Sequence, residues 1–200
     1  KRWIGELVSK QIRTVNMLGC HDGIPLLDLK GLLDEERIAA LIDTIVGRGG
    51  YVKDLHGAKN IYYQVNATYH SALGESDARL LLARAIQCFM PGKPQVWYLD
   101  LFAGRNNHAA VEKVGSGGHK EINRTNLSAD AVAAGLSQPV VQRQLELLRF
   151  RNNFGAFGFD AACEVAETAS DQLSITWRKD GLWARLDADL TSETFEITTG

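Results

Sequence analysis

Residues 14–29 read TVNMLGCHDGIPLLDL, and the predicted fold of the chain depends on how this stretch is divided into strands and turns. A short apolar run ends at Gly19, a polar turn follows, and a second apolar run begins at Ile24. Apolar runs of this length indicate a buried strand, although length alone leaves a buried helix segment open. The turn between them carries His21 and Asp22, and a buried charge is costly unless it is paired or used. Because barrels of strand–helix units have their active sites at the carboxyl ends of the strands, this turn is the first candidate for a site.

Composition and charge are those of an ordinary globular chain. Its 200 residues are 45% hydrophobic and 23% charged, with a formal net charge of −2. Scattered basic residues and a slightly negative charge give no electrostatic reason to expect nucleic acid or an anionic membrane as partner. No apolar stretch approaches the roughly 20 residues of a membrane span, and the first residues lack the apolar core of a signal peptide. The chain begins with Lys1 rather than Met, which predicts a piece of a longer protein.

Cysteine usage predicts a reducing compartment. Cys20, Cys88 and Cys163 are odd in number and far apart, which favours reduced thiols and a cytoplasmic location over a disulfide framework. No cysteine or histidine spacing suits zinc, so we expect no metal site. The oligomeric state is left open by the sequence.

Three segments of the chain are predicted to be helices, and the second of them is apolar on most sides, as a buried helix is. A helix is expected over 35–46 after an Asp34 cap, over 78–90 after a Ser76 cap, and over about 139–150. Residues 95–102 form a near-continuous apolar run, typical of a strand covered on both faces. Residues 51–64 show no helical period and are predicted to be a loop, as are the glycine-rich residues 115–124.

The pattern changes after about residue 154. Residues 164–168 and 172–179 alternate between apolar and polar, Asp180-Gly181 is a favoured two-residue hairpin turn, and 182–190 and 194–198 complete an antiparallel set. Two strand–helix units cannot close a barrel and leave sheet edges open. The sequence therefore predicts an α/β fold in which residues 1–153 end a larger domain and residues 154–200 form a small antiparallel β domain.

Five sequence blocks in the same order resemble the sucrose phosphorylase subfamily of glycoside hydrolase family 13, within the alpha-amylase superfamily. They are HDGI (21–24), YQVNATYHSALG (63–74), PGKPQVWYLDLFAG (91–104), INR (122–124) and LLRFRN (147–152). The resemblance implies the last part of a TIM (β/α)8 barrel followed by a C-terminal β domain. It also implies that the nucleophile and the acid/base carboxylate lie upstream of Lys1, so the chain alone is expected to be inactive.

The resemblance implies a role for Asp22 and for its neighbours. Asp22 would stabilise the oxocarbenium-like transition state, and His21 would hydrogen-bond sugar hydroxyls. Arg124 would hold the transferred glucose. The alternatives are that Asp22 merely caps a turn with His21 packed nearby, and that Arg124 is a surface residue paired with Glu121.

The remaining candidates concern phosphate and the acceptor. Tyr63 would place phosphate and Gln64 would contact the acceptor, although the alternation of residues 63–69 also fits the start of a strand. Asn60 belongs to the same substrate-binding segment, NIYYQ (60–64). His119 and Lys120 would serve a charged acceptor, unless they are solvated loop residues.

The activity implied by the resemblance is that of a retaining glycoside phosphorylase, which cleaves an α-glucoside with inorganic phosphate to α-glucose 1-phosphate. No cofactor is expected. Ile61 occupies the position of an acceptor-binding aspartate in sucrose phosphorylases proper, which favours the sister groups and, as acceptor, glycerol. Sucrose 6′-phosphate, sucrose and glucosylglycerate remain as alternatives. A hydrolase or transglycosylase of the same superfamily and a non-catalytic carbohydrate-binding module are the rival classes.

Overall fold

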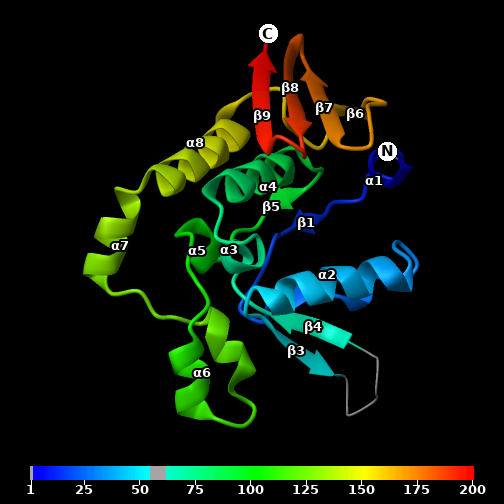
Figure 1. The fold of residues 1–200 in the computed structure, drawn as a ribbon. Helices are drawn as coiled ribbons and strands as arrows, with labels where there is room; N and C mark the ends of the chain where they lie inside the picture. Colours follow the sequence, from blue (N-terminus) through cyan, green and yellow to red (C-terminus); the bar gives the residue numbers. More distant parts are fainter. Residues whose placement is uncertain (1, 55–61) are drawn as a thin grey trace. The chain divides into compact units, whose positions relative to one another are not determined.

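The computed structural model describes residues 2–54 and 62–200, and the chain divides into two compact units (Figure 1). The first unit consists of Lys1–Met17, Leu81–Gln95 and Gln142–Gly200, and the second of Leu18–Leu80 and Val96–Val141. Neither unit is continuous in sequence, because the division falls within helices α4 (Asp77–Phe89) and α8 (Pro139–Asn153).

A four-stranded antiparallel sheet forms much of the first unit. Its strands follow one another in sequence and in space: β6 (Ala162–Val165), β7 (Gln172–Lys179), β8 (Leu182–Asp189) and β9 (Thr194–Thr199). The turn between β7 and β8 has positive φ at Asp180 (50°) and Gly181 (83°), as a primed hairpin turn requires. The antiparallel set predicted from the alternating pattern is confirmed.

One buried face of this sheet packs with helices α4 and α8. Ile175, Trp177 and Leu186 on the sheet share a core with Phe89 of α4 and Leu147 of α8. The Trp177 indole nitrogen donates a hydrogen bond of 2.8 Å to the Phe89 carbonyl oxygen. Helices α4 and α8, which come earlier in the sequence, therefore cover the apolar face of the sheet.

A short parallel strand pair completes the first unit. Helix α1 (Arg2–Ser9) precedes β1 (Val15–Asn16), which pairs with β5 (Lys93–Pro94) in parallel. Gln87 of α4 donates hydrogen bonds to the carbonyl oxygens of Asn16 and Gln95 at 3.0 and 2.9 Å, which ties the helix to the ends of both strands. Parallel neighbours joined through a helix are the arrangement expected of strand–helix units.

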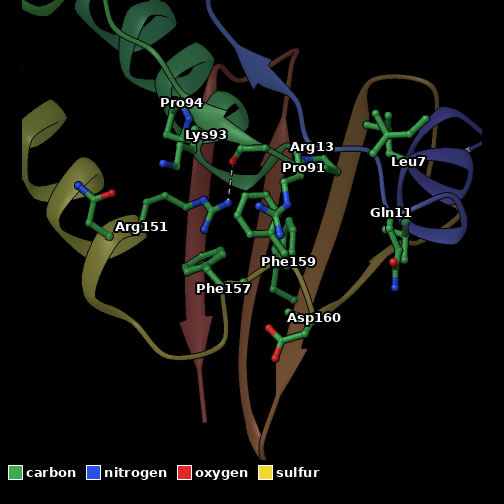
Figure 2. A pocket seen from close by; sticks show the side chains of 17 residues that line it. Leu7, Gln11, Arg13, Pro91, Lys93, Pro94, Arg151, Phe157, Phe159 and Asp160 are labelled. Carbon is green, nitrogen blue, oxygen red and sulfur yellow. Dashed lines mark hydrogen bonds between the residues drawn. The ribbon is translucent and has the colours of Figure 1, made fainter.

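The first unit also contains a cavity of about 510 Å³ at the segment that follows α8 (Figure 2). The Arg151 guanidinium lies over the Phe157 ring at 4.3 Å and donates to the Gly92 carbonyl oxygen at 3.0 Å. Arg13 lies over the Phe159 ring at 4.5 Å. Burial lowers the pKa of Arg151, and the aromatic face and the carbonyl replace part of its lost hydration.

The second unit is built on a three-stranded antiparallel sheet in the order β2 (Ile24–Pro25), β4 (Tyr62–Asn66), β3 (Tyr51–Asp54). Its core contains Val65 of β4 together with Ile42 and Ile45 of helix α2 (Glu35–Gly47). The Asp34 carboxylate accepts a hydrogen bond of 2.8 Å from the Arg37 amide, so the predicted cap of α2 is confirmed.

The remaining elements of the second unit are short helices. They are η1 (Leu27–Leu29), α3 (Tyr69–Ala72), α5 (Tyr98–Leu101), α6 (His108–Val114), η2 (Gly118–Asn123) and α7 (Ala129–Leu136). Of these, η2 lies inside the stretch 115–124 that was predicted to be a loop.

Two predictions of secondary structure are wrong. Residues 51–54 and 62–64 belong to paired strands rather than to a loop, and Val52 and Val65 lie opposite each other and pack in the same core. The run 95–102 is not a strand: after β5 the chain turns into α5, where buried Asp100 accepts a hydrogen bond of 3.2 Å from the Tyr69 amide. An apolar run without a period does not specify the backbone that buries it.

In the described residues, none of the helices has the length and apolar character needed to cross a bilayer.

Candidate active site

The residues His21 and Asp22 lie at the tip of a tight turn in the second unit. The Gly23 amide donates to the Cys20 carbonyl oxygen at 2.9 Å, and the Cys20 amide donates back to the Gly23 carbonyl at 3.3 Å. Gly23 has φ of +105°, and a Cβ atom there would lie 2.3 Å from the Val65 carbonyl oxygen on β4. Only glycine allows the turn to approach the strand so closely.

A second contact with β4 holds the same turn. The Asn66 side-chain amide donates a hydrogen bond of 2.6 Å to the Asp22 carbonyl oxygen. Asn66 is fully buried, so this bond satisfies a polar group that would otherwise be costly to bury. The backbone of Asp22 is therefore located by strand β4.

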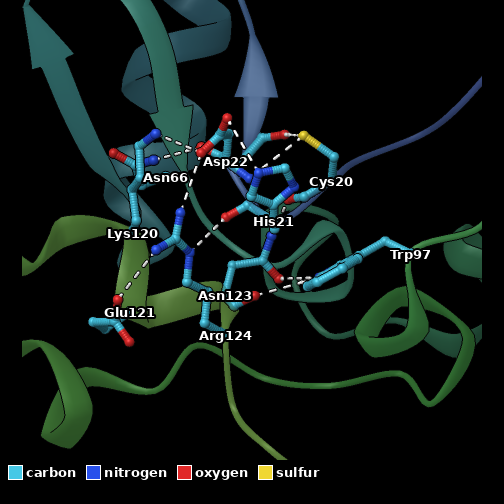
Figure 3. A network of polar contacts seen from close by, with 10 residues as sticks. Cys20, His21, Asp22, Asn66, Trp97, Lys120, Glu121, Asn123 and Arg124 are labelled. Atoms are coloured by element: carbon cyan, nitrogen blue, oxygen red, sulfur yellow. Dashed lines mark hydrogen bonds and ion pairs between the residues drawn. The ribbon is translucent and has the colours of Figure 1, made fainter.

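Helix η2 and the residue after it bring two cations to Asp22 (Figure 3). Lys120 Nζ donates a hydrogen bond to Asp22 Oδ1, and Arg124 Nη2 donates to the same oxygen at 3.3 Å. His21 Nε2 lies 3.5 Å from the other oxygen, Oδ2. The Asp22 side chain is 35% exposed and that of His21 is 56% exposed, so both are open to a ligand.

The η2 segment is anchored to the turn by Asn123 and Arg124. Asn123 is 1% exposed, and its side-chain amide donates to the Cys20 carbonyl oxygen at 2.6 Å. The Trp97 indole nitrogen donates to Asn123 Oδ1 at 3.2 Å, and the Trp97 ring lies 5.8 Å from that of His21. Arg124 Nε adds a bond of 3.2 Å to the His21 carbonyl oxygen. These contacts bring residues far apart in the sequence into one site.

The neighbouring cations hold the pKa of the Asp22 carboxyl below its ordinary value. The hydrogen bond from Lys120 is the largest cause, and the charges of Lys120, His21 and Arg124 act in the same direction, while partial burial opposes them. Asp22 therefore remains a carboxylate under neutral conditions.

The structure brings together four of the residues that the sequence singled out: His21, Asp22, Lys120 and Arg124. Arg124 also lies 3.4 Å from Glu121, so its pairing with Glu121 accompanies its contact with Asp22 rather than excluding it. Lys120 contacts Asp22 directly, although its side chain remains 29% exposed.

The other candidates lie on or near β4 and η2. Gln64 is 4% exposed on β4, and its Nε2 lacks a hydrogen-bond partner among the described residues. Tyr63 is a residue of strand β4, and Asn60 lies outside the described residues. The His119 ring lies 5.4 Å from that of Tyr51, which in turn contacts His108 Nδ1 through its hydroxyl at 3.2 Å.

Sequence reasoning missed Asn66, Asn123 and Trp97. The Trp97 indole nitrogen supports the site through its bond to Asn123. The two asparagines have no local signal for this role, because the carbonyl groups that their amides bind lie 44 and 103 residues away in the chain.

The charged side chains around Asp22 are suited to binding a polar organic ligand. In residues 2–54 and 62–200, no three His, Cys, Asp or Glu side chains are grouped so that they would hold a metal ion. A carboxylate flanked by imidazole, ammonium and guanidinium groups offers both acceptors and donors to the hydroxyls of a sugar.

Comparisons with known proteins agree with this chemistry. No protein-family model matches the chain. A sucrose 6(F)-phosphate phosphorylase of Ilumatobacter coccineus is 57% identical over 206 aligned residues, which cover 98% of this chain and 39% of that protein. A glucosylglycerol phosphorylase of Marinobacter adhaerens is 37% identical, over 92% of this chain and 38% of that protein. The crystal structure of sucrose 6F-phosphate phosphorylase from Thermoanaerobacter thermosaccharolyticum matches with a TM-score of 0.88 at 35% identity, over 98% of this chain and 42% of that one.

These three relatives are all glycoside phosphorylases. More closely, the chain belongs to the sucrose phosphorylase-like family, which includes sucrose 6(F)-phosphate, glucosylglycerol and sucrose phosphorylases, and the predicted resemblance is confirmed. Its C-terminal four-stranded sheet is similar to the C-terminal part of sucrose 6F-phosphate phosphorylase. The chain spans about two fifths of the length of these relatives.

Proposed function

We propose that the protein containing this chain is a retaining glycoside phosphorylase, which cleaves an α-glucoside with inorganic phosphate and releases α-glucose 1-phosphate and a free acceptor. The observation that carries the proposal is the exposed Asp22 carboxylate at a turn tip, with His21, Lys120 and Arg124 converging on it, in a chain homologous to such phosphorylases.

The proposed reaction is a double displacement. In the first step a general acid protonates the acceptor oxygen as its bond to the anomeric carbon breaks and a carboxylate nucleophile bonds that carbon. In the second step a phosphate oxygen bonds the anomeric carbon, the bond to the nucleophile breaks, and the phosphate proton passes to the acid/base residue. Retention of configuration follows from the two inversions.

In this mechanism the described residues bind and stabilise rather than form covalent bonds. Asp22 faces the positive charge that develops on the sugar ring, and a fixed charge of this kind acts mainly in the transition state. His21 and Arg124 donate to sugar hydroxyls. Tyr63 serves phosphate, Gln64 and Asn60 serve the acceptor, and His119 serves a charged acceptor. No cofactor takes part.

The architecture we propose for the whole protein is a TIM (β/α)8 barrel that contributes the nucleophile and the acid/base residue. Strands β1 and β5 would be two of its neighbouring strands, since they pair in parallel. Residues 1–153 would complete the barrel and residues 154–200 would form the C-terminal β domain. We place the enzyme in the cytoplasm, in keeping with three free thiols, two of which have a pKa raised by burial to about 11 (Cys88) and about 12 (Cys163).

For the acceptor we favour fructose 6-phosphate, released from sucrose 6F-phosphate. Relatives of 57% and 39% identity carry that activity in their names, and Lys120 and Arg124 supply cations beside Asp22. Glycerol, predicted from the sequence, stays a second candidate, supported by the glucosylglycerol phosphorylase of 37% identity.

The test is an assay of phosphate release from glucose 1-phosphate by the full-length protein, with fructose, fructose 6-phosphate, glycerol and glycerate as acceptors. Release that depends on one acceptor supports the phosphorylase and identifies its substrate. Release of free glucose at the same rate with every acceptor indicates a hydrolase. A folded protein that retains α-glucosides on a column without turning them over indicates a binding module.

A further inference from the structure

Lys120 is hydrogen-bonded to the Asp22 carboxylate, and the proposed reaction requires that carboxylate to face the sugar ring. We propose that Lys120 is an exchangeable cation: it pairs with Asp22 before substrate binds and transfers to a phosphate group when substrate binds. The phosphate group is either inorganic phosphate or the phosphoryl group of the acceptor. This inference rests on the proposed phosphorylase function and adds to it a residue that couples sugar binding to anion binding.

Two cationic side chains share one oxygen of the Asp22 carboxylate. Lys120 and Arg124 both donate to Oδ1, so two positive groups face one negative oxygen. A carboxylate in this state offers little net negative charge to a cationic sugar ring, because opposite charges nearby cancel its field. One of the two cations has to leave before Asp22 can stabilise the transition state.

Lys120 is the cation that is free to leave. Arg124 is held at three points, by Asp22, by the His21 carbonyl oxygen and by Glu121. Among the residues that the structure describes, Asp22 is the only side chain that accepts a hydrogen bond from Lys120. Breaking that one contact releases Lys120 and leaves Arg124 in position.

The exchange requires no movement of the backbone. The η2 segment is fixed by buried Ile122 and Asn123, while the Lys120 and Asp22 side chains are 29% and 35% exposed. Ion pairs exposed to this extent are weak and exchange readily with solvent or ligand. A lysine ammonium sits on a flexible four-carbon stem, so rotation of the side chain alone moves its charge.

Charge balance identifies the ligand that Lys120 would take. Asp22 and Glu121 balance Lys120 and Arg124 before substrate binds. Once Asp22 faces the positive sugar ring, Lys120 is left without an anion. A phosphate group restores the balance, and a lysine ammonium binds phosphate as a compact point charge.

The experiment compares Lys120→Met and Lys120→Arg in the full-length enzyme, with Lys113→Met as the matched control. Lys113 is an exposed lysine of α6, in the same unit and outside the site. We expect Lys120→Met to raise the KM of one phosphate-bearing substrate by roughly tenfold or more, the effect of losing one charge-assisted hydrogen bond. Lys120→Arg should recover most of this loss, and Lys113→Met should behave like the wild type.

The acceptor panel distinguishes the two phosphate sources. If Lys120 takes inorganic phosphate, its loss raises the KM of phosphate and the share of free glucose among the products, whatever the acceptor. If Lys120 takes the acceptor's phosphoryl group, only the KM of fructose 6-phosphate rises.

A Lys120→Met enzyme with unchanged KM values for phosphate and fructose 6-phosphate and a lower kcat would overturn the inference, because Lys120 would then act only on Asp22. If Lys120→Met fails to fold, Lys120→Gln takes its place, and unchanged KM values in that variant overturn the inference equally. A wild type without phosphorolysis removes the proposed function itself, whereas a wild-type phosphorylase with insensitive Lys120 variants removes only the exchange.

Discussion

Asp22 combines two properties at the scale of a single residue. Its backbone is fixed, by Asn66 and by the closeness of Gly23 to β4, and its side chain is exposed and ionised. A fixed charge in a partly open site stabilises a transition state without reorganising when the charge develops. The loss of that charge should therefore affect turnover more than binding.

The first prediction concerns this charge. Asp22→Asn in the full-length enzyme should lower kcat by roughly 10²–10³ or more, because the substitution removes one preorganised electrostatic group. Steady-state kinetics with glucose 1-phosphate measures the effect, and far-ultraviolet circular dichroism checks the fold. Turnover close to that of the wild type in a folded variant would remove Asp22 from the catalytic role.

The second prediction concerns the titration of Asp22. Its pKa is lowered in the folded state, so its ion pairs contribute stability above the unfolded pKa of about 3.9, and that stability is lost as pH falls through the folded pKa. Carbon-13 NMR of the carboxyl group in this chain should give a value below the ordinary one, and Lys120→Met should raise it. An identical pKa in wild type and variant would show that Lys120 does not pair with Asp22 in solution.

The third prediction distinguishes two effects of adding a side chain at Gly23, which are backbone strain at positive φ and a steric clash with the Val65 carbonyl oxygen. Gly23→Ala should destabilise the chain by at least about 2 kcal/mol, because positive φ is strained for alanine and its Cβ meets the Val65 carbonyl oxygen. Gly31→Ala is the control: φ there is +80°, but nothing lies within 4 Å of the added Cβ. Urea unfolding measures both, and equal losses would mean that the contact with Val65 is unimportant.

At the scale of elements, the predictable parts of the fold were those with a clear period. The strands β7 and β8 alternate along their length and were correctly placed, as were α2 with its Asp34 cap and α4 with Ser76, whose hydroxyl accepts from the Arg79 amide at 3.3 Å. The hairpin β3–β4 was missed because its first strand is short and mostly polar. Val52 packs against the core that contains Ile42 and Ile45 of α2, and this contact is visible only in the folded structure.

The same limit explains which parts of the site were predictable. Asp22, His21 and Arg124 were identified through motifs, and Lys120 through its closeness to INR in the sequence. The supporting amide of Asn123 was not, because its role depends on the carbonyl of Cys20, which lies far earlier in the chain. Long-range backbone acceptors leave no local signal in a sequence.

The fourth prediction tests η2 as an element. Asn123→Ala should lower the stability of the chain by about 1–3 kcal/mol, since it removes a buried amide that donates to the Cys20 carbonyl oxygen and accepts from the Trp97 indole nitrogen. Asn126→Ala, in the exposed segment that follows, is the control and should change little. Thermal denaturation compares the two, and equal midpoints would contradict the anchoring role.

At the scale of the whole chain, the two compact units are interleaved in sequence. The core beneath the β6–β9 sheet includes Leu82, Ala85 and Phe89 of α4 and Leu147 of α8, all outside residues 154–200. The boundary near residue 153 remains a prediction for the domain organisation. Whatever that boundary, the sheet draws part of its core from earlier segments.

The fifth prediction follows from this core. Residues 154–200 expressed alone should not unfold cooperatively, because the buried faces of Ile175 and Leu186 lose the helices that cover them. Urea titration followed by tryptophan fluorescence measures this, with the 200-residue chain as control. A cooperative transition in the short piece would show that the β sheet is self-sufficient.

The contact of Gly23 and Asp22 with β4 has a consequence for protein engineering. The hairpin that presents Gln64 is also the surface against which the turn at Asp22 rests. Under the proposed function, a hairpin transplanted from a related phosphorylase to alter acceptor choice would shift Asp22 along with Gln64. Residues 20–24 and the β3–β4 hairpin should accordingly be replaced together. Under the proposed function, variants that change only the hairpin are expected to lose turnover when their acceptor selectivity changes.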